Sequence, residues 1–369
     1  MKNRQMQNSK SHKQRGFTLV ELMVALALSL LVVAASVSAL LVSRQGFTSI
    51  DAASQLRDNA RFATDFITRL SVQSGFKDTK YVDTTSHSVF KSIGTPSDPD
   101  SPVFGFNNAR ITNQTDPIGT ISSPTTQNDS RNSCPTTEGT ACANGSDVLV
   151  LRYQAGSRNT DSGAGSGPAE IDNAMFNCAG IPETNTPTSA SDVIESMLYV
   201  DRSGSNLEPT LMCKYRSGSG LGWVAVPTPL VQGVESFQIL YGTDGVVAGS
   251  IPVARSPIGV IPNQPPFTGQ PDSVPEKYLR ADQLTVVGNN AATKENWRRV
   301  RSLRIGLVVR GAVGSAQDRA TATVLRPLGN AFVSNLDRQS DFVQIPPAGD
   351  GRLRQVVTFT VYLHNFQRI

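Results

Sequence analysis

The stretch Gly16-Phe17-Thr18-Leu19-Val20-Glu21 opens an apolar run that continues to residue 42, and Glu21 is its only charged residue. As an α-helix, residues 17–42 would span about 39 Å, enough to cross the hydrocarbon core of a bilayer. An unpaired carboxylate in hydrocarbon costs a few kcal/mol, so we expect Glu21 to have a partner there.

A basic leader, residues 1–16, precedes this run and contains no acidic residue. Its basic residues are Lys2, Arg4, Lys10, Lys13 and Arg15. Because positive residues beside a membrane segment stay in the cytoplasm, the leader predicts that the C-terminal bulk is exported. Two other interpretations are a secretory signal cleaved after the small-residue run 35–39 and a plain single-span anchor. The position of Glu21 and the length of the run argue against the secretory signal.

The leader and the residues after it closely resemble the class III leader of type IV pilins and type II secretion pseudopilins. This resemblance implies that a membrane peptidase cleaves after Gly16 and that the new N-terminal residue, Phe17, is N-methylated. It also implies that Glu21 pairs with the N-terminal amine of a neighbouring subunit during assembly.

The excess of basic over acidic residues lies in the leader. Without residues 1–16, 29 Lys and Arg face 30 Asp and Glu, so the remainder is close to neutral. This balance does not predict affinity for nucleic acid or acidic lipid. Charged residues are only 17% of the chain, while Ser, Thr, Asn, Gly and Pro are abundant, which is typical of a loop-rich extracytoplasmic β protein.

All four cysteines fall in the region predicted to be exported: Cys134, Cys142, Cys178 and Cys213. An even number in an oxidising compartment predicts two disulfides, with three possible connectivities. We favour pairing 134 with 142 and 178 with 213. A zinc site is the weaker alternative, because no Cys-x-x-Cys pair occurs and His87 and His364 are distant in sequence.

Beyond residue 42, apolar residues recur every three or four positions. They are Ile50, Ala53, Leu56, Ala60, Ala63, Ile67 and Leu70. This period predicts that the helix continues as an amphipathic segment over residues 43–75 and stops at Gly75. The remainder, residues 76–369, is predicted to be an extracytoplasmic β-rich domain.

Alternating or continuous apolar residues predict several strands in that domain. The predicted strands cover residues 148–153, 196–200, 210–215, 222–226, 230–241, 302–310 and 355–364, with a hairpin between the second and third. In the strand 302–310, alternation directs Leu303 inward and Arg304 and Arg310 toward solvent. The predicted fold is therefore α+β, with a long N-terminal helix packed on a mainly antiparallel sheet domain with long loops.

The order of these features resembles the PilW family of minor type IV pilins, which is related to the J-type pseudopilins of type II secretion. The residues that carry the resemblance are Gly-Val-Glu-Ser-Phe-Gln-Ile-Leu-Tyr-Gly at 233–242, Arg-Val-Arg-Ser-Leu-Arg-Ile-Gly-Leu-Val-Val-Arg at 299–310 and Phe-Thr-Val-Tyr-Leu-His-Asn at 359–365. The resemblance implies a pilin-like fold. It also implies a minor pilin that primes pilus assembly at the tip and supports pilus biogenesis, twitching motility, adhesion or DNA uptake.

The partners implied are other minor pilins, the major pilin, the prepilin peptidase and an inner-membrane assembly platform. The protein is expected in the inner membrane, with a single pass and a periplasmic C-terminal domain, and in the assembled pilus. The alternatives are a type II secretion minor pseudopilin and a pilus-borne adhesin whose loops 77–144 bind a surface.

No catalytic, cofactor or metal motif is found, so we do not expect an enzyme. The glycine-rich run 162–167 lacks the Lys-Ser/Thr of a phosphate loop, and Asp98 with Asp100 makes too small a set for calcium.

Four arginines raise the question of DNA binding: Arg298, Arg299, Arg301 and Arg304. Strand alternation accounts for the last of them, and we do not expect nucleic acid as a partner.

Overall fold

The computed structural model describes residues 16–78, 101–109, 111, 145–159, 169–184, 186–189, 192–203, 208–217, 222–251, 274–316, 324–330, 344, 346 and 349–366. Two compact units divide the chain, residues 1–51 and 52–369.

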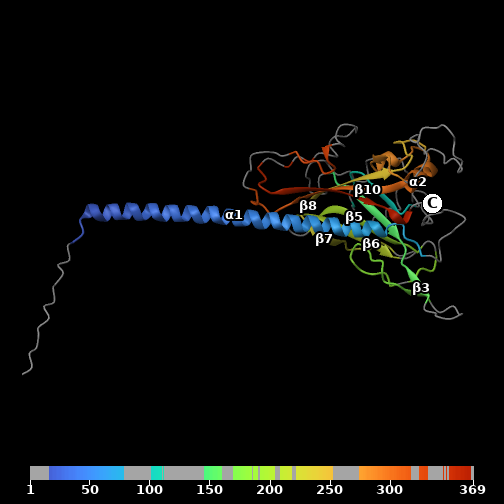
Figure 1. Cartoon of the computed structure of the whole chain (residues 1–369), viewed down its shortest axis with the longest axis horizontal. Coiled ribbons are helices and arrows are strands. Elements are labelled where there is room, and N and C mark those ends of the chain that lie inside the picture. The colour runs from blue at the N-terminus through green and yellow to red at the C-terminus, as the bar shows by residue number, and fades with distance from the viewer. Residues whose placement is uncertain are drawn as a thin grey trace, which may run out of the picture. The chain divides into compact units, whose positions relative to one another are not determined.

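The described residues form two α-helices and eleven strands, together with 3₁₀ turns at Asp282–Leu284 and His364–Phe366. In chain order the elements are α1 Leu19–Gln73, β1 Val103–Phe106, β2 Val148–Tyr153, β3 Ser157–Asn159, β4 Ala169–Ile171, β5 Ile194–Ser203, β6 Glu208–Ser217, β7 Thr228–Gln232, β8 Val234–Thr243, β9 Lys277–Leu279, α2 Asn290–Arg298, β10 Val300–Arg310 and β11 Arg354–Tyr362. Figure 1 labels most of them.

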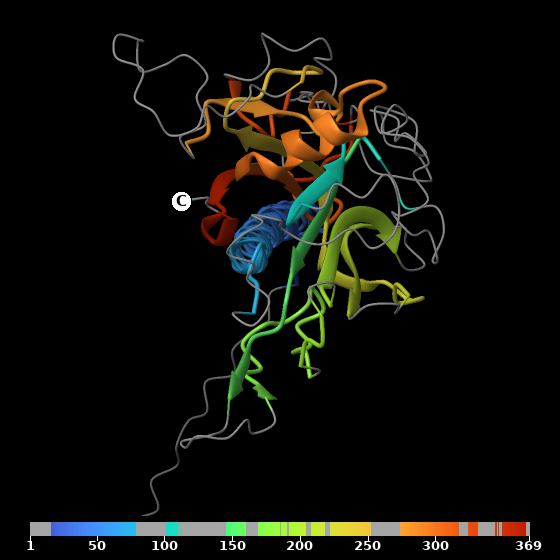
Figure 2. The same ribbon diagram turned by 90° about the vertical axis from the view of Figure 1, so that its right-hand side faces the viewer.

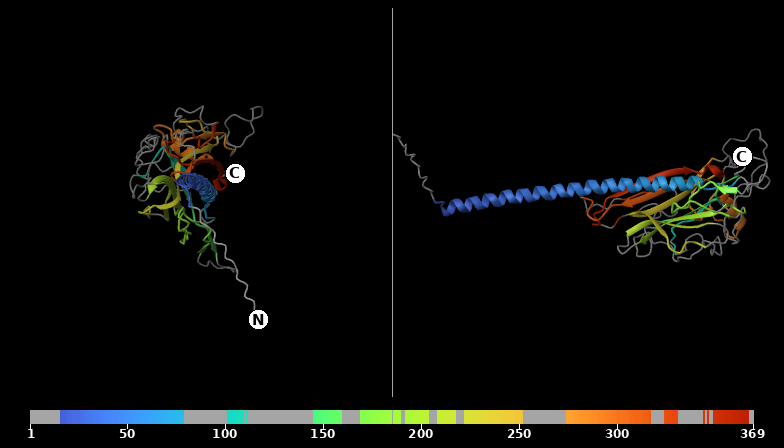
Figure 3. Two further views of the ribbon diagram at one scale, coloured as in Figure 1. Left: turned by 90° about the vertical axis from the view of Figure 1, so that its left-hand side faces the viewer. Right: turned by 90° about the horizontal axis from the view of Figure 1, so that it is seen from below.

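The strands form three antiparallel sheets. Five strands pair in the order β1-β2-β5-β6-β7, four in the order β11-β10-β8-β9, and β3 pairs with β4. The part of α1 that belongs to the domain lies in the angle between the two larger sheets, as seen down the helix in Figure 2 and from below in Figure 3. The predicted α+β fold with a long N-terminal helix and antiparallel sheets is confirmed.

One face of α1 is buried in this angle. Its apolar members are Ala52, Leu56, Ala60, Ala63, Ile67 and Leu70. They recur every three or four residues, which places them on one side of a helix. The helix ends where Gly75 adopts a φ of 85°, as predicted. The side chain of Asn365 then caps the helix end, because its Nδ2 donates to the Val72 carbonyl oxygen at 2.8 Å.

Two strand predictions need correction. Residues 222–226 form no strand; the strand after β6 is β7, which pairs with β6 on the side away from β5. The predicted strand 230–241 is two strands, because Gly233 turns the chain between β7 and β8 with a φ of 84°. A Cβ at this position would also meet the Arg310 carbonyl oxygen at 2.6 Å.

The carboxylate of Asp147 joins the two larger sheets at the start of β2. It accepts from the backbone N–H of Asn108 at 2.8 Å and from that of Ile239, in β8, at 2.7 Å. Nearby, Tyr241 of β8 reaches under Gly105 of β1, where a Cβ would overlap the tyrosine oxygen. The sheets therefore approach closely at a site that only glycine fits.

The sequence prediction placed Arg310 toward solvent, and this is wrong. Arg310 is buried and faces Arg354 directly across β10 and β11. Glu235 of β8 bridges the two: its carboxylate accepts from Arg310 Nη1 at 2.9 Å and from Arg354 Nε at 2.7 Å. The alternation of apolar and polar residues along 302–310 could not reveal the burial of Arg310. Both faces of the sheet are covered here, and the carboxylate that pairs with Arg310 comes from a distant segment of the chain.

Glu208, the first residue of β6, extends this network to the other large sheet. It accepts hydrogen bonds from Arg310 Nη2 and from Arg352 Nη1, the latter at 2.6 Å. Partial burial by itself would raise the pKa of Glu208, but the two arginines outweigh it and hold this pKa below its ordinary value.

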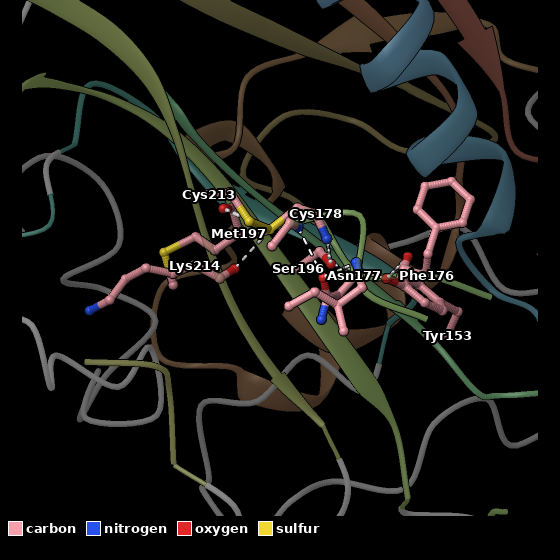
Figure 4. Close-up of a disulfide and its surroundings, with 10 residues drawn as sticks. Tyr153, Phe176, Asn177, Cys178, Ser196, Met197, Cys213 and Lys214 are labelled. Carbon is pink, nitrogen blue, oxygen red and sulfur yellow. Dashed lines mark hydrogen bonds between the residues drawn. A yellow bond between two sulfur atoms is a disulfide. The ribbon is translucent and has the colours of Figure 1, made fainter. Parts of the chain in front are cut away.

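A disulfide fixes the segment between β4 and β5 to the five-stranded sheet. Cys178 and Cys213 are fully buried and bonded, as predicted. The Cys178 backbone N–H donates to Ser196 Oγ at 3.0 Å, and the same hydroxyl lies 3.0 Å from the Tyr153 oxygen (Figure 4). Cys134 and Cys142 lie outside the described residues.

The lowered pKa of Glu208 predicts how its contribution depends on pH. Its stabilisation is complete above the ordinary glutamate pKa of about 4.3 and is lost as the pH falls through the lowered value. At pH 7, Glu208→Gln should therefore lower the free energy of unfolding by about 1–3 kcal/mol. Denaturant titrations at falling pH should show this difference shrinking. Asp58→Asn, on the exposed face of α1, is the control with little effect; a pH-independent difference for Glu208→Gln would contradict the prediction.

Loss of the disulfide should destabilise the domain through the unfolded chain. The double variant Cys178→Ala/Cys213→Ala should unfold about 2–4 kcal/mol more easily than the unmodified chain in non-reducing urea titrations, since the bond closes a long loop. In reducing conditions the two proteins should converge. Equal stability without reductant would show that the bond contributes nothing.

Candidate functional site

The N-terminal part of α1 holds the residues that the sequence singled out for processing and assembly. Gly16 and Phe17 immediately precede the helix, and the Phe17 side chain is 79% exposed. Thr18 is the residue before the helix: its Oγ1 accepts the backbone N–H of Glu21 at 3.3 Å. Thr18-x-x-Glu21 is the sequence pattern of a helix capping box, a signal that the sequence prediction missed.

Glu21 lies exposed in the first turn of α1. A carboxylate at this end is stabilised by the helix dipole. Within the described part of the chain, no cationic group pairs with the Glu21 carboxylate.

The same part of α1 exposes a continuous apolar surface. It is the one helix among the described residues that is long and apolar enough to cross a membrane, with a mean hydropathy of 2.6 in its most apolar window. Its serines are satisfied within the helix: Ser29 Oγ donates to the Leu26 carbonyl at 2.9 Å, and Ser36 Oγ donates to that of Val32 at 2.8 Å. Hydroxyl groups bonded in this way need no water, which suits an apolar environment.

The arginines considered for DNA binding are held within the protein. Arg299 pairs with Glu295 at 3.4 Å, and Arg304 donates to the Leu328 carbonyl oxygen at 3.2 Å. Arg301 Nε lies 3.6 Å from the buried carboxylate of Asp244. These contacts explain the arginines as parts of the fold.

No catalytic or metal-binding set emerges among the residues that the structure describes. They contain no group of three or more His, Cys, Asp and Glu that could hold a metal ion. Burial raises the pKa of Tyr153 well above its ordinary value, which keeps this hydroxyl protonated. His364 is described and exposed, whereas His87, Asp98, Asp100 and the run 162–167 lie outside the described residues.

Comparisons with known proteins support a pilus-related protein. Residues 197–365 match the family model of type IV pilus-assembly protein W, and residues 11–37 match the prokaryotic N-terminal methylation motif. The second match includes Gly16, Phe17 and Glu21. No curated protein matches the chain significantly.

Among solved structures, a type IV-like pilin from Thermus thermophilus is similar over 62% of this chain and 84% of its own, with 16% identity and a TM-score of 0.28. That score is too low to bear on the fold. The chain therefore carries a domain of the PilW family of type IV pilus-assembly proteins at residues 197–365 and the methylation motif around Gly16.

Proposed function

We propose that this chain is a minor pilin that primes assembly of a type IV pilus, at the pilus tip, together with other minor pilins and the major pilin. A prepilin peptidase removes the leader after Gly16, and residues 17–42 hold the protein in the inner membrane with the β domain in the periplasm. The observation that carries the proposal is the N-terminal part of α1, which combines the methylation motif with an exposed apolar surface and one carboxylate.

Glu21 is the residue that we propose for subunit contact. Cleavage after Gly16 creates a new amine at Phe17, and the same amine on a neighbouring subunit is the cation that Glu21 would bind. In a low-dielectric environment such a pair is strong, and an unpaired partner is costly. Charge pairing would therefore set the axial position of one helix against the next, while the apolar side chains supply packing.

In this proposal the β domain has a structural role. We propose no catalysis for it; energy for assembly comes from a separate cytoplasmic ATPase acting through the inner-membrane platform. The match to a pilus-assembly family favours pilus biogenesis over type II secretion. A deletion strain that loses pili but secretes normally would support the pilus role, whereas loss of secretion alone would favour the pseudopilin.

Processing can be tested at the N-terminus of the membrane-extracted protein. Intact mass spectrometry should show a start at Phe17, N-methylated, in cells that contain the prepilin peptidase. Cells without the peptidase should yield the chain with its leader. A start after residue 39, or an unprocessed chain in both strains, would contradict the proposed processing.

Removing the Glu21 carboxylate should block entry into filaments. Glu21→Ala leaves the neighbouring amine unpaired in an apolar environment, and its abundance in sheared filaments should fall at least about tenfold relative to the membrane fraction. Asp58→Ala removes an exposed carboxylate from a later part of the same helix and is the matched control. Wild-type incorporation of Glu21→Ala would remove the role proposed for Glu21.

A further inference from the structure

One edge of the four-stranded sheet lacks the features that keep sheet edges from pairing. Short strands, prolines and bulges are the usual protection. At the other edges of the two larger sheets, β1 has four residues, β9 has three, and β7 contains Pro229 and is joined to β6 by a shifted register. By contrast, β11 has nine residues, pairs with β10 in unbroken register, and has no charge from Gln355 to Tyr362.

On its outer side, β11 pairs with no second strand among the residues that the structure describes. Its inner side pairs with β10. Val357 and Phe359 pack against the core but remain partly exposed, and Tyr362 is 52% exposed. An added strand would pair the outward backbone groups and cover these side chains, which is the mode of recognition by strand addition.

The sequence of β11 indicates which strand fits. Its centre, Val357-Thr358-Phe359-Thr360-Val361, reads the same in both directions. In an antiparallel pair of two copies centred on Phe359, the two phenylalanines face each other, each threonine faces a threonine, and each valine faces a valine. Aromatic, threonine and β-branched pairs of this kind stabilise antiparallel sheets, and no like charges meet over the pair's centre.

We propose that the outer edge of β11 binds the same edge of a second copy of this chain, antiparallel and centred on Phe359. The contact is two-fold symmetric, so it closes on itself and yields a dimer rather than an open chain. The two four-stranded sheets would join into one continuous sheet.

The pairing would also fix the relative direction of the two α1 segments that lie within the paired domains. Within the domain, α1 and β11 run in the same direction. Near the start of β11, Leu56 of α1 lies beside Gly311, whose backbone N–H donates to the Leu353 carbonyl oxygen. Just after the end of β11, the Asn365 side chain donates to the carbonyl oxygen of Val72, close to the end of α1. An antiparallel pair therefore has its two helices running in opposite directions. The strand pairing does not rest on the proposed function.

The test uses the full chain in detergent micelles and measures its mass against concentration by light scattering and sedimentation. We expect a monomer–dimer equilibrium. Thr360→Lys puts a charge into the centre of the pair and should raise the dissociation constant at least tenfold. Thr228→Lys makes the same change on the protected edge strand β7 and should leave the equilibrium unchanged. Thermal unfolding of both variants verifies that they fold.

The register can be tested separately by oxidative cross-linking. Thr358 of one copy faces Thr360 of the other, so a mixture of Thr358→Cys and Thr360→Cys chains should form a covalent dimer more readily than either variant alone. A chain that is monomeric at every concentration, a dimer unaffected by Thr360→Lys, or cross-linking that is equal in all samples would overturn the proposal. These readouts do not depend on leader cleavage or filament entry, so failure here is distinguishable from failure of the proposed function.

Discussion

Burial of one face of α1 between two sheets is the interaction on which the rest of the domain depends. Ile67 and Leu70 are fully buried there, and each such side chain contributes about 1.5–3 kcal/mol. Ala60 and Ala63 lie on the same face, and their small size lets both sheets approach the helix. The larger of the two core clusters accordingly has members from α1 and from both larger sheets. The N-terminal turns of α1 expose their apolar side chains. Contact with lipid or with other helices would remove this apolar surface from water.

Buried charge pairs join neighbouring strands in both large sheets. In the four-stranded sheet, the Glu235 carboxylate of β8 pairs with Arg310 of β10 and with Arg354 of β11. In the five-stranded sheet, Glu195 of β5 faces Arg152 of β2 on one side and Arg216 of β6 on the other, and it pairs with both. A slip of one residue would turn each charge to the opposite face. Removing one partner would leave a buried charge unpaired. The resulting loss of folding free energy is larger than the net stabilisation that the intact pair contributes.

Local patterns in the sequence were enough to predict α1 and the long strands, but not α2 or the short strands β3, β4 and β9. The period of apolar residues gave the helix and its buried face, and alternation gave β2, β10 and β11. What failed depended on distant contacts. The turn at Gly233 required knowledge that β7 pairs with β6, and the burial of Arg310 required Glu208 and Glu235 from two other strands. In the assembly segment, Gly16, Phe17 and Glu21 were recognisable from a motif, whereas the cap formed by Thr18 was overlooked although its pattern is local.

The contact between Asn365 and the end of α1 has a consequence for the order of folding. The two residues that it joins, Val72 and Asn365, are 293 positions apart in the chain. The helix can form while synthesis is still in progress, but its last turn is capped only when the residues after β11 have been made. Contacts of such long sequence separation slow folding, because a long loop must close before they contribute. Until then the apolar face of α1 has only part of its cover, so the unfinished chain exposes an apolar helix surface.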